Sequence, residues 1–165
     1  MLPEGVARIG AFLFSGSAVE RVSIPASVRA LGEEAFSYCA KLVRVDIASG
    51  TALAEIGVSC FQGSGLREFR VPASVRAIGD GAFGLCRDLA RVTFAEGSAP
   101  GEVGVQAFAR SGLEAFVAPA GLRVVGMAAF RGCKALCEVR AAGGSAAVVA
   151  GKLGPSVRVI SEETE

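Results

Sequence analysis

The sequence predicts a β-rich solenoid, in which short segments coil around one axis and each turn packs against the next. Phenylalanine recurs at intervals of 22, 25, 22, 25 and 22 residues, at Phe14, Phe36, Phe61, Phe83, Phe108 and Phe130. An eight-residue segment recurs every 47 residues, as PASVRALG from Pro25, PASVRAIG from Pro72 and PAGLRVVG from Pro119. Such periods are typical of solenoids, because each turn buries its apolar side against its neighbours. The true unit is therefore a pair of turns, copied about three times.

Each turn is expected to contain one short strand with a buried and an exposed face. In the segment from Leu42 to Ile47, Val45 points inward and the polar residues Arg44 and Asp46 flank it. This alternation predicts a half-buried strand. The equivalent segments are 19–24, 66–71, 89–94, 113–118 and 136–141. Because all these strands return in the same direction, we expect them to pair in parallel as one continuous sheet.

The rest of each turn is predicted from proline, glycine and phenylalanine. A proline such as Pro25 suits the corner that leaves the sheet, because it lacks an N–H group. A glycine follows in every turn, which indicates either a positive φ or a close approach of two backbone segments. These glycines are Gly10, Gly32, Gly57, Gly79, Gly104 and Gly126. Each Phe then lies on a single helical or 3₁₀-like turn that points its ring inward.

The repeats indicate one domain over residues 1–165, with six full turns over 9–141. Residues 142–165 lack the expected Phe turn, so we interpret them as a degenerate last turn and a cap. Within them, Pro155–Ile160 imitates the corner segment, and Glu162, Glu163 and Glu165 form an acidic tail that would oppose stacking. Only eight residues precede the first turn at Ile9, so we expect any homo-oligomer to form through that N-terminal end.

Composition bounds the partners. The formal net charge is +1, which gives no general attraction for nucleic acid or membrane surfaces. Mean hydropathy is high, at +0.50, but no apolar run approaches the 18 or so residues of a membrane span. The opening residues show no basic region followed by an apolar one, so we expect no signal peptide, and the compartment stays open.

Two segments match catalytic or nucleotide-binding motifs, but neither has the surrounding residues that its motif requires. The chain contains no histidine, which removes the usual general base and the commonest zinc ligand. Gly79–Gly84 matches the G-x-G-x-x-G dinucleotide pattern, but the next strand begins at Leu89 and leaves no room for the helix that the pattern needs. Gly151–Lys152 lacks the flanking residues of a phosphate loop. We therefore expect no enzyme, no cofactor and no metal site.

Five cysteines are present, and Cys39, Cys86 and Cys133 keep the 47-residue spacing. Equivalent positions two turns apart lie roughly 10 Å from each other, beyond the roughly 7 Å that a disulfide allows between Cα atoms. We expect these three as reduced, buried thiols that pack as small apolar groups. Cys137 falls at an outward or edge strand position and is the candidate accessible thiol.

The consensus I-P-x-S-V-x-x-I-G-x-x-A-F-x-x-C-x-x-L-x-x-V-x-I, read from these copies, resembles the BspA-like, or treponemal-type, leucine-rich repeat. The resemblance covers residues 9–141. It implies a right-handed leucine-rich-repeat solenoid, with a parallel sheet on one face and short turns on the other. Members of that family are mostly bacterial and protist proteins, many of them on cell surfaces and several implicated in adhesion. The resemblance therefore implies a non-catalytic module that binds a protein partner.

The outward face of the sheet is the candidate partner-binding surface. Its candidate residues are Arg21, Arg44, Asp46, Glu68, Arg70, Arg91, Thr93, Val117, Glu138 and Arg140. Opposite charges on neighbouring rungs, as in Arg44 with Glu68, fit a solvated face with cross-strand ion pairs, or a concave surface that engages a protein. A second arginine row at the corners, Arg29, Arg76 and Arg123, is interpreted as solvation. The alternative function is a structural repeat protein that self-associates through an apolar end or surface.

Overall fold

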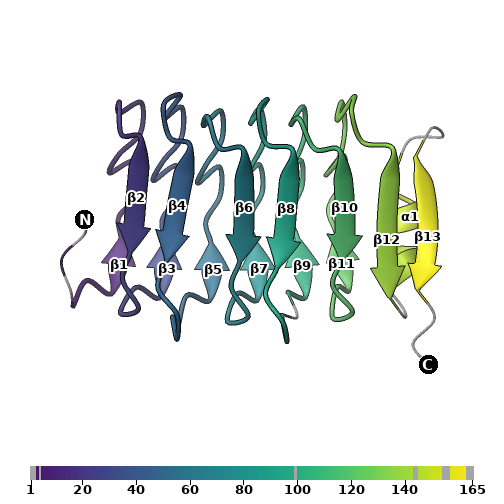
Figure 1. The fold of residues 1–165 in the computed structure, drawn as a ribbon, viewed down its shortest axis with the longest axis horizontal. Helices are drawn as coiled ribbons and strands as arrows, with labels where there is room; N and C mark the ends of the chain where they lie inside the picture. Colours follow the sequence, from purple (N-terminus) through teal and green to yellow (C-terminus); the bar gives the residue numbers. More distant parts are fainter. Residues whose placement is uncertain (1–2, 4, 99, 143–144, 154–156, 163–165) are drawn as a thin grey trace.

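In the computed structural model the chain coils as a right-handed solenoid with the two termini at opposite ends (Figure 1). The structure describes residues 3, 5–98, 100–142, 145–153 and 157–162. Six turns, each centred on one of the recurring phenylalanines, follow one another along the axis. The expected solenoid fold is confirmed. Some expectations concern residues outside the described part of the chain. These residues are 1 and 2, which precede the first turn, Pro155 and Ser156, and Glu163 and Glu165.

The front face carries the predicted strands. Every strand pair on this face is parallel. The strands are β2 (Arg21–Ile24), β4 (Arg44–Ile47), β6 (Glu68–Val71), β8 (Arg91–Phe94), β10 (Ala115–Ala118), β12 (Glu138–Ala142) and β13 (Arg158–Glu162). In the first six, the strand begins two residues after the apolar residue that opens the predicted pattern. We call this surface the sheet face.

The sheet face is not one continuous sheet, which corrects the expectation. Strands β2 and β4 form a pair, whereas β6, β8, β10, β12 and β13 form a separate sheet. Strands β6 and β8 pair over four residues, but β8 and β10 pair over only two. The unpaired neighbours β4 and β6 are separated by the connection after Ile47, and the weakly paired β8 and β10 by the connection after Phe94. Both connections are longer than the others and have no proline at the corner position. The longer connections spread the strands apart. Strand pairing is therefore lost or shortened after every second turn, with the same two-turn period as the sequence.

A second parallel sheet, which the sequence did not predict, runs behind the first. Its strands are β1 (Arg8–Ile9), β3 (Ala30–Leu31), β5 (Glu55–Ile56), β7 (Ala77–Ile78), β9 (Glu102–Val103) and β11 (Val124–Val125). The recurring glycine follows each of these strands, and its φ is not positive. A Cβ on Gly79 would lie 2.8 Å from the carbonyl carbon of Gly57. Close approach of the backbones, and not a positive φ, therefore explains this glycine.

The phenylalanine turns are not helical, which corrects the helical or 3₁₀-like expectation. The residues two before and two after each Phe have a positive φ, as in Gln106 (54°) and Arg110 (58°). The N–H groups of those two residues and of Phe108 donate to carbonyls of the next turn, and three such bonds of 2.6–3.0 Å join every consecutive pair of turns. This ladder forms the third side of the solenoid. We call it the turn face, made of residues 12–16, 34–38, 59–63, 81–85, 106–110 and 128–132.

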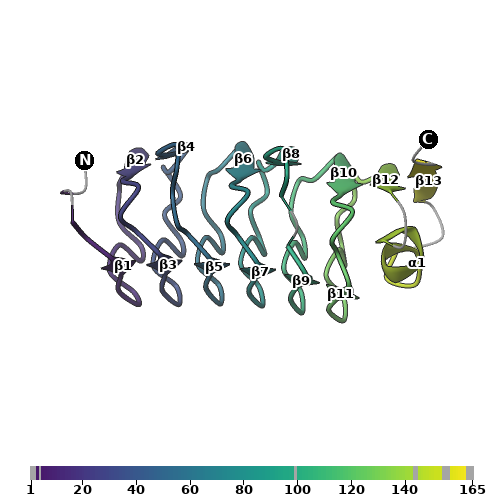
Figure 2. The ribbon, with the colours of Figure 1, turned by 90° about the horizontal axis from the view of Figure 1, so that it is seen from below.

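The core is a stack of aromatic rings. Successive ladder phenylalanines lie with centroids 5.2–5.7 Å apart and interplanar angles of 6–14°. Phe83 is fully buried between Phe61 and Phe108, as expected. This spacing is close to the distance of about 4.8 Å between paired strands. The stack therefore runs nearly straight, and the sheet face is close to flat instead of concave (Figure 2).

The C-terminal residues close the solenoid differently from the expectation. After β12 the chain forms helix α1 (Ser145–Ala150) in place of another phenylalanine turn, and Val149 of this helix is fully buried. Strand β13 then pairs with β12, with Arg158 opposite Glu138. Residues 158–160 thus belong to a strand of the sheet face, not to a corner. Alternating apolar residues override the resemblance to the corner segment because they can extend the existing sheet.

Candidate partner-binding face

The structure places all ten predicted site residues on the outward side of the sheet face. They form two rows, because the outward positions of each strand are two residues apart. The first row is Arg21, Arg44, Glu68, Arg91, Ala115, Glu138 and Arg158, and the second is Ser23, Asp46, Arg70, Thr93, Val117, Arg140 and Ile160. Of the ten predicted residues, nine are exposed and Glu138 is partly buried.

Two members of these rows were missed. Arg158 lies opposite Glu138, and Ile160 lies opposite Arg140. The alternation of Val157, Arg158 and Val159 could have indicated a strand. The corner-like Pro-Ser-Val that overlaps it concealed this interpretation.

Two ion pairs between described residues of this face each run along a single strand. The Nε of Arg44 lies 2.7 Å from Oδ1 of Asp46, and the Nε of Arg140 lies 2.7 Å from Oε1 of Glu138. The predicted partnership of Arg44 with Glu68 is not formed, because β4 and β6 are not hydrogen-bonded to each other. Exposed pairs of this kind contribute only about 0–1 kcal/mol to stability. They hold two arginine side chains in place on the surface.

The sheet face is rich in arginine and carries two apolar side chains, Val117 and Ile160, on either side of Arg140. Among the described side chains of the two rows, six arginines stand against three carboxylates, so these rows carry a net positive charge although the chain is nearly neutral. Val117, Arg140 and Ile160 lie side by side in the second row, and Val117 is 50% exposed. Arginine is enriched at protein interfaces, where its guanidinium donates several hydrogen bonds and its stem covers apolar surface. The arrangement suits contact with another protein.

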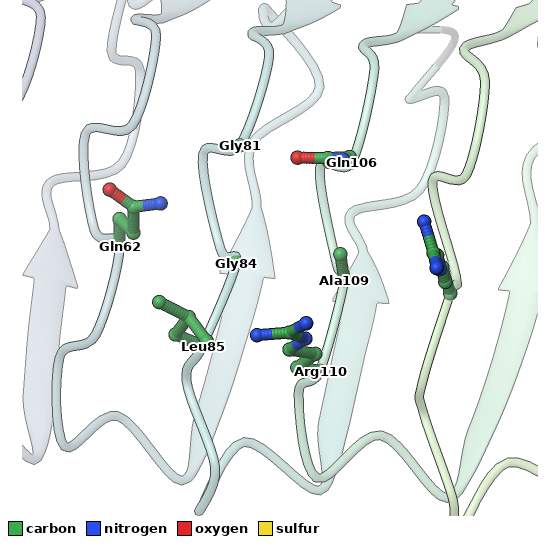
Figure 3. Close-up of a pocket in the computed structure, with 8 residues that line it drawn as sticks. Gln62, Gly81, Gly84, Leu85, Gln106, Ala109 and Arg110 are labelled. Carbon is green, nitrogen blue, oxygen red and sulfur yellow. The ribbon is translucent and has the colours of Figure 1, made fainter.

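The G-x-G-x-x-G segment forms a shallow cleft on the turn face. Gly81 and Gly84 leave a hollow of about 220 Å³, toward which the side chains of Gln106 and Arg110 extend (Figure 3). The segment is the fourth phenylalanine turn and no helix follows it before β8. The prediction that it is a repeat turn is therefore confirmed. Amide and guanidinium groups line the cleft without a carboxylate, which gives it no acid–base pair.

The cysteine ladder is confirmed as buried free thiols. Cys39, Cys86 and Cys133 each donate an S–H to the carbonyl of the phenylalanine in the preceding turn, with Sγ–O distances of 2.9, 3.0 and 3.0 Å. A serine of that same turn lies beside each thiol, such as Ser64 beside Cys86 at 3.5 Å. Burial raises the pKa of Cys86 to about 11. Burial also raises the pKa of Cys133, and that of Cys60 more strongly.

Cys137, the candidate accessible thiol, is exposed, whereas the other four cysteines are buried. Among the residues that the structure describes, no cluster of His, Cys, Asp or Glu could hold a metal ion. In the same part of the chain, no helix is long and apolar enough to cross a membrane.

The sequence profile of the BspA type leucine rich repeat region matches residues 7–137 in six copies. The chain belongs to this family. A search of curated proteins found no match. The six profile copies agree with the six phenylalanine turns, so the BspA-type repeat and the structural turn are the same unit.

Solved structures share the BspA-type fold. The pneumococcal vaccine antigen PcpA superimposes with a TM-score of 0.79 at 24% identity, over 86% of this chain and 37% of that one. A leucine rich cell surface protein of Faecalibacterium prausnitzii gives 0.56 at 24% identity, over 82% and 43%. The T. pallidum leucine-rich-repeat protein gives 0.55 at 29% identity, over 84% and 54%. The chain thus spans about a third to a half of the length of these proteins.

Proposed function

We propose that this BspA-type chain is a non-catalytic protein-binding module that engages a partner through its sheet face. The observation that carries the proposal is the exposed surface of six arginines with Val117 and Ile160 beside them. Leucine-rich repeats serve as protein-interaction or surface repeats, which supports this role. The complete absence of histidine supports a role without catalysis.

The expected partner presents a flat surface with carboxylates around an apolar patch. The near-straight stack gives the sheet face little curvature, so it fits a broad surface better than a projecting loop. Arginine pairs bidentately with carboxylates, which adds geometric specificity. One relative is described as a cell surface protein and another as a vaccine antigen, and we extend this to contact with a host or neighbouring cell.

Adhesion of protein-coated beads to cultured epithelial cells tests the proposal. The double variant Arg70→Glu with Arg91→Glu reverses two charges at the centre of the sheet face, and we expect it to lower bead adhesion at least tenfold. The control is Arg76→Glu with Arg123→Glu, which makes the same charge change on exposed corner residues. Equal losses with both variants, or no adhesion of the unmodified protein, would count against a sheet-face site.

The alternative function is self-association through the N-terminal end. Phe12 and Leu13 are 54% and 59% exposed on the first turn. The carbonyls of Ala11, Leu13 and Ser15 hold the positions that accept three N–H groups in every later turn, and none of the hydrogen bonds among the described residues uses them. Exposed apolar side chains beside unpaired backbone acceptors favour association.

Light scattering on Phe12→Glu tests this alternative. If the protein is an oligomer, the charge should shift it to monomers, because it would have to be buried in the contact. Tyr38→Glu is the control, since Tyr38 is also 54% exposed but lies on the second turn. An oligomer unaffected by Phe12→Glu would place the contact elsewhere, with the sheet face as the next candidate.

A further inference from the structure

The sixth turn ends the turn face with a row of backbone N–H groups that have no acceptor among the described residues. In each of the five preceding turns, three N–H groups donate to carbonyls of the following turn. The equivalent donors in the sixth turn belong to Ala128, Phe130 and Gly132. None of the hydrogen bonds among the described residues uses these three groups. Phe130 is buried, Ala128 is half-buried and Gly132 is exposed, so these groups take their acceptors from a bound molecule or from solvent.

A groove occupies the place where a seventh turn would stack. Helix α1 packs against β10, β11 and β12, but a hollow of about 460 Å³ remains between the sixth turn and Lys152, Leu153 and Val157. All three donor residues line it, together with Lys152 and Leu153. The groove also reaches the core, because Phe130 and Cys133 are 6% and 9% exposed whereas their counterparts in the fourth turn are fully buried.

The groove is electropositive. Arg131, Lys134 and Lys152 line it, and none of the described residues that line it carries a carboxylate. Ala128 and Gly132 have φ values of 57° and 75°, and backbone N–H groups beside such left-handed residues form concavities that accept negatively polarised atoms. Cationic side chains and neutral donors therefore converge on one hollow with an apolar floor.

We propose that this groove binds an acidic peptide segment of a protein partner. Its backbone carbonyls accept the hydrogen bonds of Ala128, Phe130 and Gly132, as the carbonyls of a seventh turn would. Its carboxylates pair with the three basic side chains. This is the turn-face counterpart of a peptide that adds a strand to an open sheet edge. The groove is distinct from the sheet face and does not depend on it.

A peptide fits the groove better than a small anion or a second copy. The donors recur at every second residue over the span of a turn, so a chain with repeating carbonyls can reach all of them and a single compact anion cannot. The first turn of a second copy carries suitable carbonyls, but stacking it in register would bring β1 against β11. Helix α1 already packs against β11.

Amide hydrogen exchange followed by NMR is the first test. The amides of Gln106, Phe108 and Arg110 should exchange slowly, because each donates to the sixth turn. Those of Ala128, Phe130 and Gly132 should exchange at least a hundredfold faster in the peptide-free protein. Protection of all three without peptide would mean that they already have internal acceptors, and the proposal would fail.

Titration with a fluorescein-labelled six-residue peptide of alternating Glu and Gly, blocked at both ends, is the second test. Binding should shift the three amides downfield and slow their exchange. Lys134→Glu with Lys152→Glu should weaken binding at least tenfold, and the control Lys41→Glu should leave it unchanged. The sheet-face variant Arg70→Glu with Arg91→Glu should bind normally, which separates this site from the proposed function. No binding, binding that leaves the three amides unshifted, equal weakening by Lys41→Glu, or the same shifts from free glutamate at equal concentration would each overturn the proposal.

Discussion

Phe83 is the residue on which the centre of the core depends. Its ring is fully buried and stacks on Phe61 and Phe108, with Phe69 packed at 5.0 Å against it. Truncation of such a residue leaves a cavity that costs about 3–5 kcal/mol. Phe83→Ala should lower the free energy of unfolding by that amount in denaturant titration. Phe12→Ala should cost less than about 1 kcal/mol, because Phe12 is 54% exposed. Equal losses would contradict the assignment of Phe83 to the stack.

The thiols differ in reactivity according to their burial. Thiolate is the reactive form, and burial raises the pKa of Cys86 to about 11, only partly offset by its hydrogen bond with Ser64. At pH 7.5 a maleimide should therefore label native protein once, at the exposed Cys137. Mass spectrometry of the labelled protein checks the number and the position. Labelling of Cys86 without denaturant would show that the ladder opens to solvent, and Cys137→Ser should remove the native label.

The spacing predicts which residues lie in the core. It does not always show which structural requirement selects a residue type at a given position. Phenylalanines that recur every 22 or 25 residues indicate a stack of rings. The sequence therefore predicts correctly that Phe83 lies in the core. The ladder glycine is different, since a positive φ and a close backbone approach both favour glycine in a sequence. Only the contact between Gly79 and Gly57 distinguishes the two.

At the scale of elements, the short strands depend on that close approach. A Cβ on Gly79 would lie 2.8 Å from backbone atoms of the preceding turn, whereas a Cβ on Gly10 would meet nothing within 4 Å. Gly79→Ala should therefore cost about 1–3 kcal/mol, because the turns must separate to admit the methyl group. Gly10→Ala makes the same chemical change in the first turn and should cost less than about 0.5 kcal/mol. Thermal unfolding of the two variants provides the comparison. A similar loss in both would show that the requirement for glycine is not the contact.

The elements that depend on hydrogen bonds to adjacent turns were the hardest to predict from the sequence. The strands of the rear sheet are two residues long and cannot display a period. Leu85 and Arg110 take a positive φ that local propensity disfavours, because hydrogen bonds to the next turn require it. The strands of the sheet face have four or more residues with clear alternation, and six of the seven could be predicted. The missed strand, β13, alternates only from Val157 to Val159, because Ile160 faces outward, and it follows a misleading proline.

At the scale of the molecule, the solenoid is nearly straight because successive turns lie at similar distances on the sheet face and on the turn face. Ordinary helices on one side would need more room than strands and would bend the solenoid. Here hydrogen-bonded turns replace helices, so the sheet face stays nearly flat. The outward rows could be predicted because they follow from the strand period. The groove at the sixth turn could not, because it depends on where α1 packs.

The cap formed by α1 and β13 should determine whether the C-terminal end is closed. Val149 is the fully buried anchor of α1, and Ala147 on the same helix is exposed. Val149→Asp would bury an unpaired carboxylate, at a cost of about 3–5 kcal/mol, or release the helix from the core. Release would uncover the sixth turn and favour association. We therefore expect Val149→Asp to lower the melting temperature and to produce concentration-dependent oligomers in light scattering, whereas Ala147→Asp should do neither. A monomeric Val149→Asp variant with an unchanged melting temperature would show that α1 does not close this end.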